Sequence, residues 1–287
     1  MVHIIVSKYS KVSDYELNNI VRLMEECYYR LSPHVVSLVD LYVFESSSLA
    51  KAFLLMERKK FGVETSSFDD LFFAMHDAWR GTPRIILCLD RIRELPELVR
   101  IGAIRHEVGH TVLHGSIEYY VLPLPKTLLE LMKLFNLSRK YVLDLLYLVS
   151  VAVKDYEVTR LLYQRGYIED QVAYVKFLLK ISEDDIISWN ASQGNPLLEA
   201  LYLIGLLKTV GCAIPLLADK NLSNEIKACM KSSVSYLPKH LSSLILNIAE
   251  GDFVNLGNDT WSNVSYITHA CKPILNAIFK KRGMSDL

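Results

Sequence analysis

The chain has 287 residues, of which 51% are hydrophobic and 22% are charged. This composition supplies a sizeable core, so an intrinsically disordered or fibrous protein is excluded. The 32 Lys and Arg residues balance the 32 Asp and Glu residues. Nucleic-acid binding needs a cationic excess or a basic stripe, and the tight basic run at residues 280–282 is only three residues long. We therefore expect no nucleic-acid partner and, from the length, about two domains.

The most apolar stretch, residues 197–218, is interrupted by Glu199 and Lys208. Its uninterrupted runs are much shorter than the ~20 residues that span a bilayer, so it predicts buried helices and no membrane span. The first residues lack the apolar core and cleavage site of a signal peptide. The five cysteines are widely spaced, without a CxxC pair, which predicts reduced thiols. Together these features predict a cytoplasmic protein.

The first 120 residues alternate between strand and helix patterns. Runs of β-branched and aromatic residues predict strands, and apolar residues at helical spacing predict helices. Pro96 is expected in the first turn of the last of these helices, where its missing N–H costs nothing. The predicted strands are residues 3–8, 35–44 and 84–90. The predicted helices are residues 14–31, 48–61 and 94–114, with a short helix around 68–73.

From residue 126 onward the pattern is almost entirely helical. Residues 1–120 are therefore predicted to form an α/β part with a short sheet, and residues 121–287 an all-helical part. The fold class is α+β and mostly helical. The predicted helices are residues 126–135, 139–165, 168–180, 196–209, 222–235, 238–249 and 262–281. The expected N-caps are Ser138, Asn195 and Thr260, and the expected helix stops are Gly166, Gly211 and Gly251.

One motif carries chemistry: residues 106–110 read HEVGH, which is the pattern HExxH on a predicted helix. His106 and His110 are four residues apart, so they lie on one helix face about one turn apart. Both imidazoles can reach a single Zn²⁺ at about 2.0–2.1 Å. Glu107 lies at the edge of that face, where it can accept a proton from water. His114 is about 12 Å of helical rise from His106, so it cannot bind the same ion.

A catalytic zinc needs a third protein ligand, and the segment 154–160 supplies two carboxylates within an otherwise apolar helix. Asp155 and Glu157 are about 200° apart, so one is expected to face the core and the other not. Asp155 shares its face with the more apolar neighbours, which favours Asp155 as the ligand. Glu157 remains the alternative ligand; otherwise we expect it to be a surface carboxylate near Lys154 or Arg160.

The segment RHEVGHTVLHG resembles the active-site helix of the zincin metallopeptidases, and most closely the ImmA/IrrE type, which reads HELGHxxLH. The segment DYEVTRLL resembles the E-x-E-A-N or E-Y-x-A-D stretch that supplies the glutamate ligand there and in HtpX-like gluzincins. In that register Asp155 falls on the ligand position, Glu157 on the intervening one and Thr159 on the Asn or Asp. This chain has Asp in place of Glu and Thr in place of Asn or Asp. The resemblance covers roughly residues 84–165.

The resemblance implies a zinc-dependent endopeptidase with one Zn²⁺ per chain, an α/β part and a helical part that supplies the third ligand. In that interpretation His106, His110 and Asp155 bind the metal, Glu107 is the catalytic base, and the partner is a peptide or protein substrate. Two alternatives stay open. One is a zincin-fold metal-binding regulatory or interaction protein with little turnover, and the other is a helical scaffold without metal.

Two further features of the predicted site are left open by the sequence. Zincins hold an extended peptide against an edge strand, and residues 84–90 are equally well an edge strand or a core strand. A Tyr or His is also expected to stabilise the oxyanion. The candidates are Tyr119, Tyr120, Tyr156, His240 and His269.

Overall fold

The computed structural model describes residues 2–62, 73–121 and 123–279. The basic run 280–282 and all but the last residue of the short helix expected at 68–73 lie outside the described residues. The chain forms two compact units. Unit 1 comprises Met1–Val121 and Leu161–Tyr174, and unit 2 comprises Leu122–Arg160 and Val175–Leu287. The sequence predicted a single boundary near residue 120 and did not anticipate the return of Leu161–Tyr174 to unit 1.

Unit 1 contains a four-stranded sheet with the order β1-β2-β4-β3. The first three strands in this order are mutually parallel, and β3 pairs antiparallel with β4. All three predicted strands are present, although β2 begins later and β4 ends earlier than expected. The short helix α3 (Leu89–Ile92) follows β4 directly. The strands are β1 (His3–Tyr9), β2 (Leu38–Phe44), β3 (Ala74–Asp77) and β4 (Arg84–Cys88).

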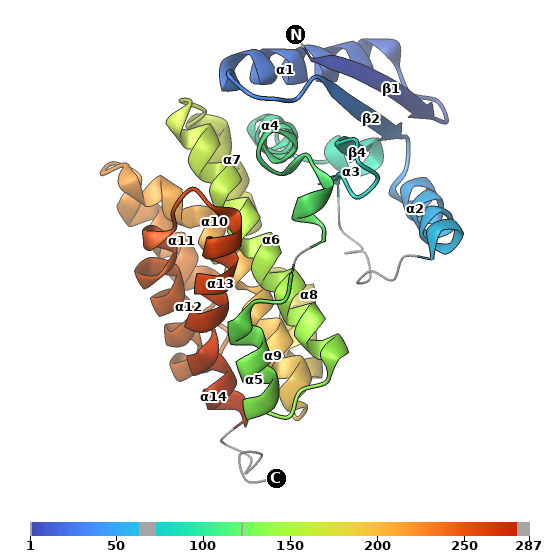
Figure 1. Cartoon of the computed structure of the whole chain (residues 1–287). Coiled ribbons are helices and arrows are strands. Elements are labelled where there is room, and N and C mark those ends of the chain that lie inside the picture. The colour runs from blue at the N-terminus through green and yellow to red at the C-terminus, as the bar shows by residue number, and fades with distance from the viewer. Residues whose placement is uncertain (1, 63–72, 122, 280–287) are drawn as a thin grey trace. The chain divides into compact units, whose positions relative to one another are not determined.

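Helices cover both faces of this sheet. On one face, Ile86 and Cys88 of β4 pack with Ala50 and Leu54 of α2 (Ser47–Phe61). Neighbouring strand residues point to opposite faces, so Ile85 and Leu87 point away from α2. There α4 (Glu97–His114) contacts β3, β4 and α1 (Asp14–Leu31). Figure 1 shows α1 running alongside β1 and β2.

An ion-pair network fixes the register of β3. Asp77 lies opposite Arg84 in the β3–β4 pair, and the Arg84 Nε donates to its two carboxylate oxygens at 2.8 and 2.9 Å. The other guanidinium nitrogens of Arg84 donate to Glu57 of α2 at 2.9 and 2.6 Å. All three side chains are buried. A slip of one residue would turn every side chain of β3 to the other face, so this network determines which way His76 points.

Unit 2 and the returning segment are helical, as predicted. The structure adds α8, which the sequence analysis did not identify, and divides each of the predicted helices 196–209 and 262–281 into two. The helices are α5 (Lys126–Leu134), α6 (Arg139–Gln164), α7 (Glu169–Leu178), α8 (Glu183–Ser192), α9 (Pro196–Gly205), α10 (Leu207–Ala213), α11 (Ser223–Ser233), α12 (Lys239–Gly251), α13 (Thr260–Ala270) and α14 (Lys272–Phe279). Three short 3₁₀ turns are η1 (Ile117–Tyr119), η2 (Ile214–Ala218) and η3 (Phe253–Asn255).

Of the expected helix caps and stops in unit 2, Gly211 and Thr260 are wrong. Gly211 lies inside α10, and a Cβ there would be 2.6 Å from the Phe253 ring, so this glycine permits a close approach of η3. Asp259, not Thr260, caps α13 by accepting a hydrogen bond from the backbone of its first turn. Asn195 caps α9 as predicted.

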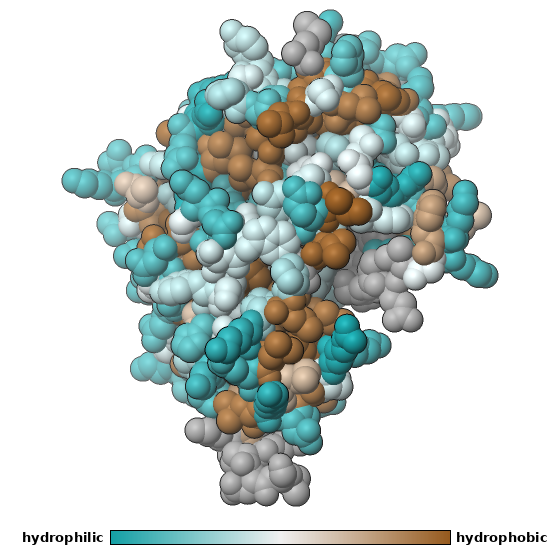
Figure 2. Space-filling view, in the orientation of Figure 1, coloured by the Kyte–Doolittle hydropathy of each residue, from teal (hydrophilic) through white to brown (hydrophobic). Residues whose placement is uncertain are grey.

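Within the described residues, one stretch, Pro196–Ala218, is long and apolar enough to cross a membrane. It consists of α9, α10 and η2, and 61% of its most apolar window is buried inside the structure. A buried core helix has the same composition. The space-filling view shows hydrophobic residues in patches separated by hydrophilic ones (Figure 2). The absence of a membrane span stays a prediction.

All five cysteines are free thiols, and Cys229 is the one that is partly exposed. Burial raises the pKa of the Cys27, Cys88, Cys212 and Cys271 thiols to about 12. These four side chains therefore act as small apolar core residues rather than as reactive thiolates.

Candidate metal and catalytic site

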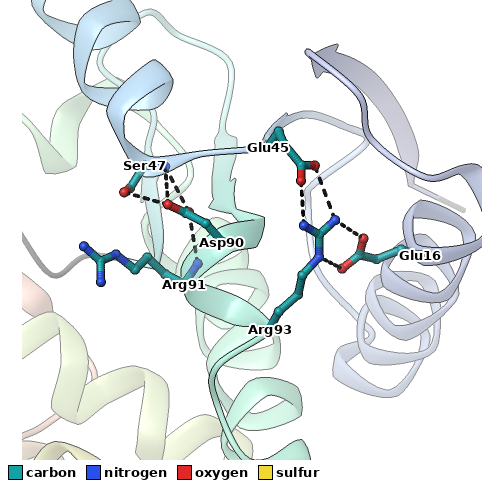
Figure 3. Close-up of polar contacts among 6 residues, drawn as sticks. All are labelled: Glu16, Glu45, Ser47, Asp90, Arg91 and Arg93. Atoms are coloured by element: carbon teal, nitrogen blue, oxygen red, sulfur yellow. Dashed lines mark hydrogen bonds and ion pairs between the residues drawn. The ribbon is translucent and has the colours of Figure 1, made fainter.

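The segment that precedes α4, which includes Asp90 of α3 and Arg93, forms ion pairs and hydrogen bonds with other parts of unit 1 (Figure 3). Arg93 forms ion pairs with Glu16 of α1 at 2.7 Å and with Glu45, after β2, at 2.6 Å. Asp90 accepts hydrogen bonds from the backbone N–H and the hydroxyl of Ser47 at the start of α2. These contacts fix the position of the residues that lead into the N-terminus of α4.

α4 begins at Glu97, three residues later than predicted. Pro96 is the N-cap rather than a residue of the first turn, and its ψ angle of 148° is not helical. The proline ring disfavours helical backbone at Leu95, which explains why residues 94–96 stay outside the helix. The helix then continues to His114, so the whole HExxH motif is helical as predicted.

α4 brings His106 and His110 together as the spacing predicted. Their Nε2 atoms are 3.1 Å apart, and their rings are 78° from parallel. Two imidazole nitrogens bound to one tetrahedral Zn²⁺ lie about 3.3 Å apart, so this donor pair fits a zinc ion. Both side chains are buried, as is Glu107. These three residues form the motif part of the candidate site.

His114 lies behind His110 on the same helix. The Nδ1 atoms of the two histidines are 3.3 Å apart, and His114 is fully buried. His110 can offer the Nε2 lone pair to a metal only when its Nδ1 carries the hydrogen. The Nδ1 of His114 is placed to accept that hydrogen. His114 is therefore placed to support the tautomer of His110 that can bind metal.

The structure adds His76 of β3 to this group. Its Nδ1 is 3.2 Å from Oε2 of Glu107, and its ring stacks on His110 with the centroids 3.9 Å apart. His76, Glu107 and His110 have potential ligand atoms within 4.8 Å of one another. The sequence analysis missed His76 because it lies in a four-residue strand, which is too short to show a clear alternation.

The returning segment packs directly against α4. A Cβ at Gly102 would lie 2.4 Å from the backbone oxygen of Asp170 and 2.8 Å from Cβ of Tyr174. Glycine is therefore required for α7 to come this close to α4. Gln171 donates a hydrogen bond to the Gly102 carbonyl at 3.1 Å. The Tyr174 ring consequently lies 5.1 Å from the ring of His106 and limits how that imidazole can turn.

The two candidate third ligands, Asp155 and Glu157, lie on α6 in unit 2. The expectation that one of them faces the core and the other does not is wrong. Both are buried, and so is every residue from 152 to 159. The helix-face argument considered only neighbours on α6, whereas other helices cover the face that was expected to be exposed. Burial also lowers the pKa of the adjacent Lys154 to about 8.

Glu157 is hydrogen-bonded to residues of α13 and is not exposed to solvent. Its Oε2 accepts a hydrogen bond from the Thr260 hydroxyl at 2.8 Å, and its Oε1 accepts one from the Asn263 amide at 2.6 Å. Both carboxylate oxygens thus have donors within unit 2. Asp155 lies 4.0 Å from Nζ of Lys208, measured from Oδ2. Glu157 is built into the core of unit 2, and Asp155 stays the predicted third ligand.

Two predictions remain, the strand that would pair with a substrate and the residue that would stabilise the oxyanion. β4 is a core strand between β2 and β3, so the interpretation of residues 84–90 as an edge strand is wrong. The sheet edge next to α4 is β3. Of the oxyanion candidates, Tyr120 has its ring 6.3 Å from that of His76. Tyr119 packs on His114, and the other three belong to unit 2.

Comparison of the chain with models of known protein families, with curated proteins and with solved structures gives no match. Support for a function therefore comes from the residues of the site themselves.

Proposed function

We propose that this protein is a zinc-dependent metallopeptidase of the zincin type, in which His106 and His110 bind the metal and Glu107 is the general base. The observation that carries the proposal is the 3.1 Å separation of the two Nε2 atoms on a buried helix face, with a Glu107 carboxylate oxygen within 4.8 Å of a ring nitrogen of His110. A bound Zn²⁺ would supply Lewis-acid polarisation of the scissile carbonyl.

Glu107 would accept a proton from the attacking water and deliver it to the leaving amine. Its burial excludes bulk solvent from that proton transfer. β3 is an edge strand among the described strands, so its outer side offers backbone groups that can pair with an extended peptide. A peptide bound there would run past His76 and Glu107. The substrate is therefore proposed to be a peptide or an extended protein segment.

Zinc content and turnover test this proposal together. The purified protein is reconstituted with zinc, and a mixed peptide library is incubated with it and read by mass spectrometry. We expect new peptide termini that disappear when a zinc chelator is added and return with added zinc. Protein that holds no zinc would overturn the proposal. Full zinc loading without cleavage would instead favour a metal-binding regulatory protein with little turnover.

Substitution of the two carboxylates of α6 should separate metal binding from folding. Asp155→Ala is expected to weaken zinc binding much more than Glu157→Ala does, because Glu157 already accepts two hydrogen bonds from α13. Glu157→Ala leaves those buried donors without their acceptor, which typically costs about 1–3 kcal/mol of stability.

Zinc affinity from competition with a chromogenic chelator, and thermal unfolding of the metal-free protein, are the two measurements. The expected pattern is a large loss of affinity only for Asp155→Ala, and a lower melting temperature for Glu157→Ala. A greater loss of affinity for Glu157→Ala would identify Glu157 as the ligand.

A further inference from the structure

We propose that His76 is a positioning residue for Glu107, which it holds by a hydrogen bond from the edge strand of the sheet. This inference rests on the proposed function, because it assigns the role of His76 relative to Glu107 as base. The Nδ1 of His76 and Oε2 of Glu107 are 3.2 Å apart, and both side chains are largely buried. The two residues are 31 positions apart in the sequence, so the contact depends on the fold.

The direction of this hydrogen bond follows from the chemistry of Glu107. A carboxylate that is to accept a proton from water must be ionised, and an ionised carboxylate only accepts hydrogen bonds. The hydrogen must therefore be on Nδ1 of His76. This assigns the Nδ1–H tautomer to His76 while Glu107 is ready to act as base.

Two independent contacts hold the donor in place. The His76 ring stacks on the His110 ring at 3.9 Å with an angle of 9° between the planes, which restricts its rotation. The adjacent Asp77 is bound to Arg84 by two hydrogen bonds, which fixes the register of β3. His76 lies opposite Ile85, whose side chain points to the face that α4 covers.

Anchoring one carboxylate oxygen determines where the other one points. The terminal torsion of a glutamate side chain is soft and roughly two-fold, so an unanchored carboxylate samples many orientations. The hydrogen bond from His76 to Oε2 fixes the plane of this carboxylate and so limits the orientations in which it can meet the attacking water. Pre-orientation of this kind lowers the entropic cost of reaching the reactive geometry. His76 is thus expected to raise kcat while it contributes little to substrate or zinc binding.

Three substitutions distinguish the hydrogen bond from simple packing. In His76→Asn, the amide nitrogen occupies about the place of Nδ1 and keeps the donor. In His76→Gln, the donor moves nearer to the place of Nε2, and His76→Leu has no donor at all. We expect kcat to fall about 10- to 100-fold in His76→Leu, the usual range for supporting partners of a metal site. KM and zinc stoichiometry should stay close to wild type, and His76→Asn should recover most of the loss, more than His76→Gln does.

Met75→Ala is the matched control. Met75 is the neighbouring residue on β3, and it packs with the core cluster beneath α2 rather than with α4. This variant perturbs the strand without touching the donor, so it should change stability more than kcat. Equal kcat for wild type and His76→Leu would overturn the proposal, as would an equal loss of kcat in Met75→Ala. Loss of zinc from His76→Leu would show that His76 is a ligand.

A second measurement separates this proposal from the proposed function, because it needs no turnover. Nitrogen-15 NMR of histidine-labelled, zinc-loaded protein reports the tautomer of each imidazole. We expect His76 to be in the Nδ1–H tautomer in the wild type and to lose that preference in Glu107→Ala. A protein that shows this shift but cleaves no peptide retains the contact, although it lacks the proposed activity. His76 in the Nε2–H tautomer in the wild type would contradict the assignment whatever the activity.

Discussion

Replacement of either His106 or His110 by Ala is expected to abolish stoichiometric zinc binding, while the wild type binds about one Zn²⁺ per chain. The two Nε2 atoms are 3.1 Å apart, so each histidine supplies one of the few ligands to the same ion. Removing one leaves at most two protein ligands, which is below the three that a catalytic zinc site uses. Elemental analysis after zinc reconstitution and removal of free metal measures the stoichiometry.

Two other histidines provide graded controls for this experiment. His114→Ala removes the acceptor 3.3 Å from Nδ1 of His110 without removing a ligand. We expect it to bind about one Zn²⁺ with an affinity about 10- to 100-fold lower, as is usual for outer-shell partners. His3→Ala changes an exposed residue of β1 and should match the wild type. Equal zinc content in the wild type and the His106→Ala variant would show that any bound metal lies elsewhere.

The local parts of the site could be predicted from the sequence, because they depend on one helix. The i, i+4 spacing alone places His106 and His110 side by side, and the apolar pattern places them on a helix after a strand. α1 (Asp14–Leu31) likewise matches its predicted bounds. In each case the positions that matter lie within about one or two turns of each other.

The parts that were missed depend on contacts between distant segments. His76 meets Glu107 only because β3 pairs with β4 and because Arg84 fixes that register, and neither contact leaves a periodic signal in four residues. The return of Leu161–Tyr174 to unit 1 depends on the close approach of Asp170 to Gly102. A lone glycine inside a helical pattern indicates a packing reason without naming the partner.

The error at Glu157 has a different origin. Helix-face reasoning assigns burial from the neighbours on the same helix, and it assumes that a helix has one buried side. α6 has eight consecutive buried residues from 152 to 159, so the assumption does not hold there. A buried carboxylate is costly unless donors satisfy it, and Thr260 and Asn263 meet that need. Those donors lie more than 100 residues further along the chain, beyond the reach of a local pattern.

Glu107→Gln is expected to bind zinc as the wild type does and to lose about 10²–10⁴-fold in the rate of peptide hydrolysis, the usual contribution of a general base. The substitution keeps the size and shape of the side chain but replaces the carboxylate by an amide, which cannot take up the proton of the attacking water. The amide oxygen can still accept the hydrogen bond from Nδ1 of His76, so the contact between β3 and α4 is preserved. The loss of rate therefore reports the missing base and not a rearranged site.

Glu97→Gln is the matched control, because it makes the same chemical change on an exposed residue of the same helix. It should leave both zinc content and hydrolysis unchanged. Both variants and the wild type are compared on a peptide that the library experiment identifies, with kcat/KM and zinc content measured on the same samples.

Equal rates for the wild type and Glu107→Gln would show that Glu107 is not the base. Loss of zinc along with activity would instead assign Glu107 a part in binding the metal, since its carboxylate lies beside His110 in a group of potential ligands. Only retained zinc with lost hydrolysis supports the separation of roles in which the two histidines hold the ion and the glutamate moves the proton.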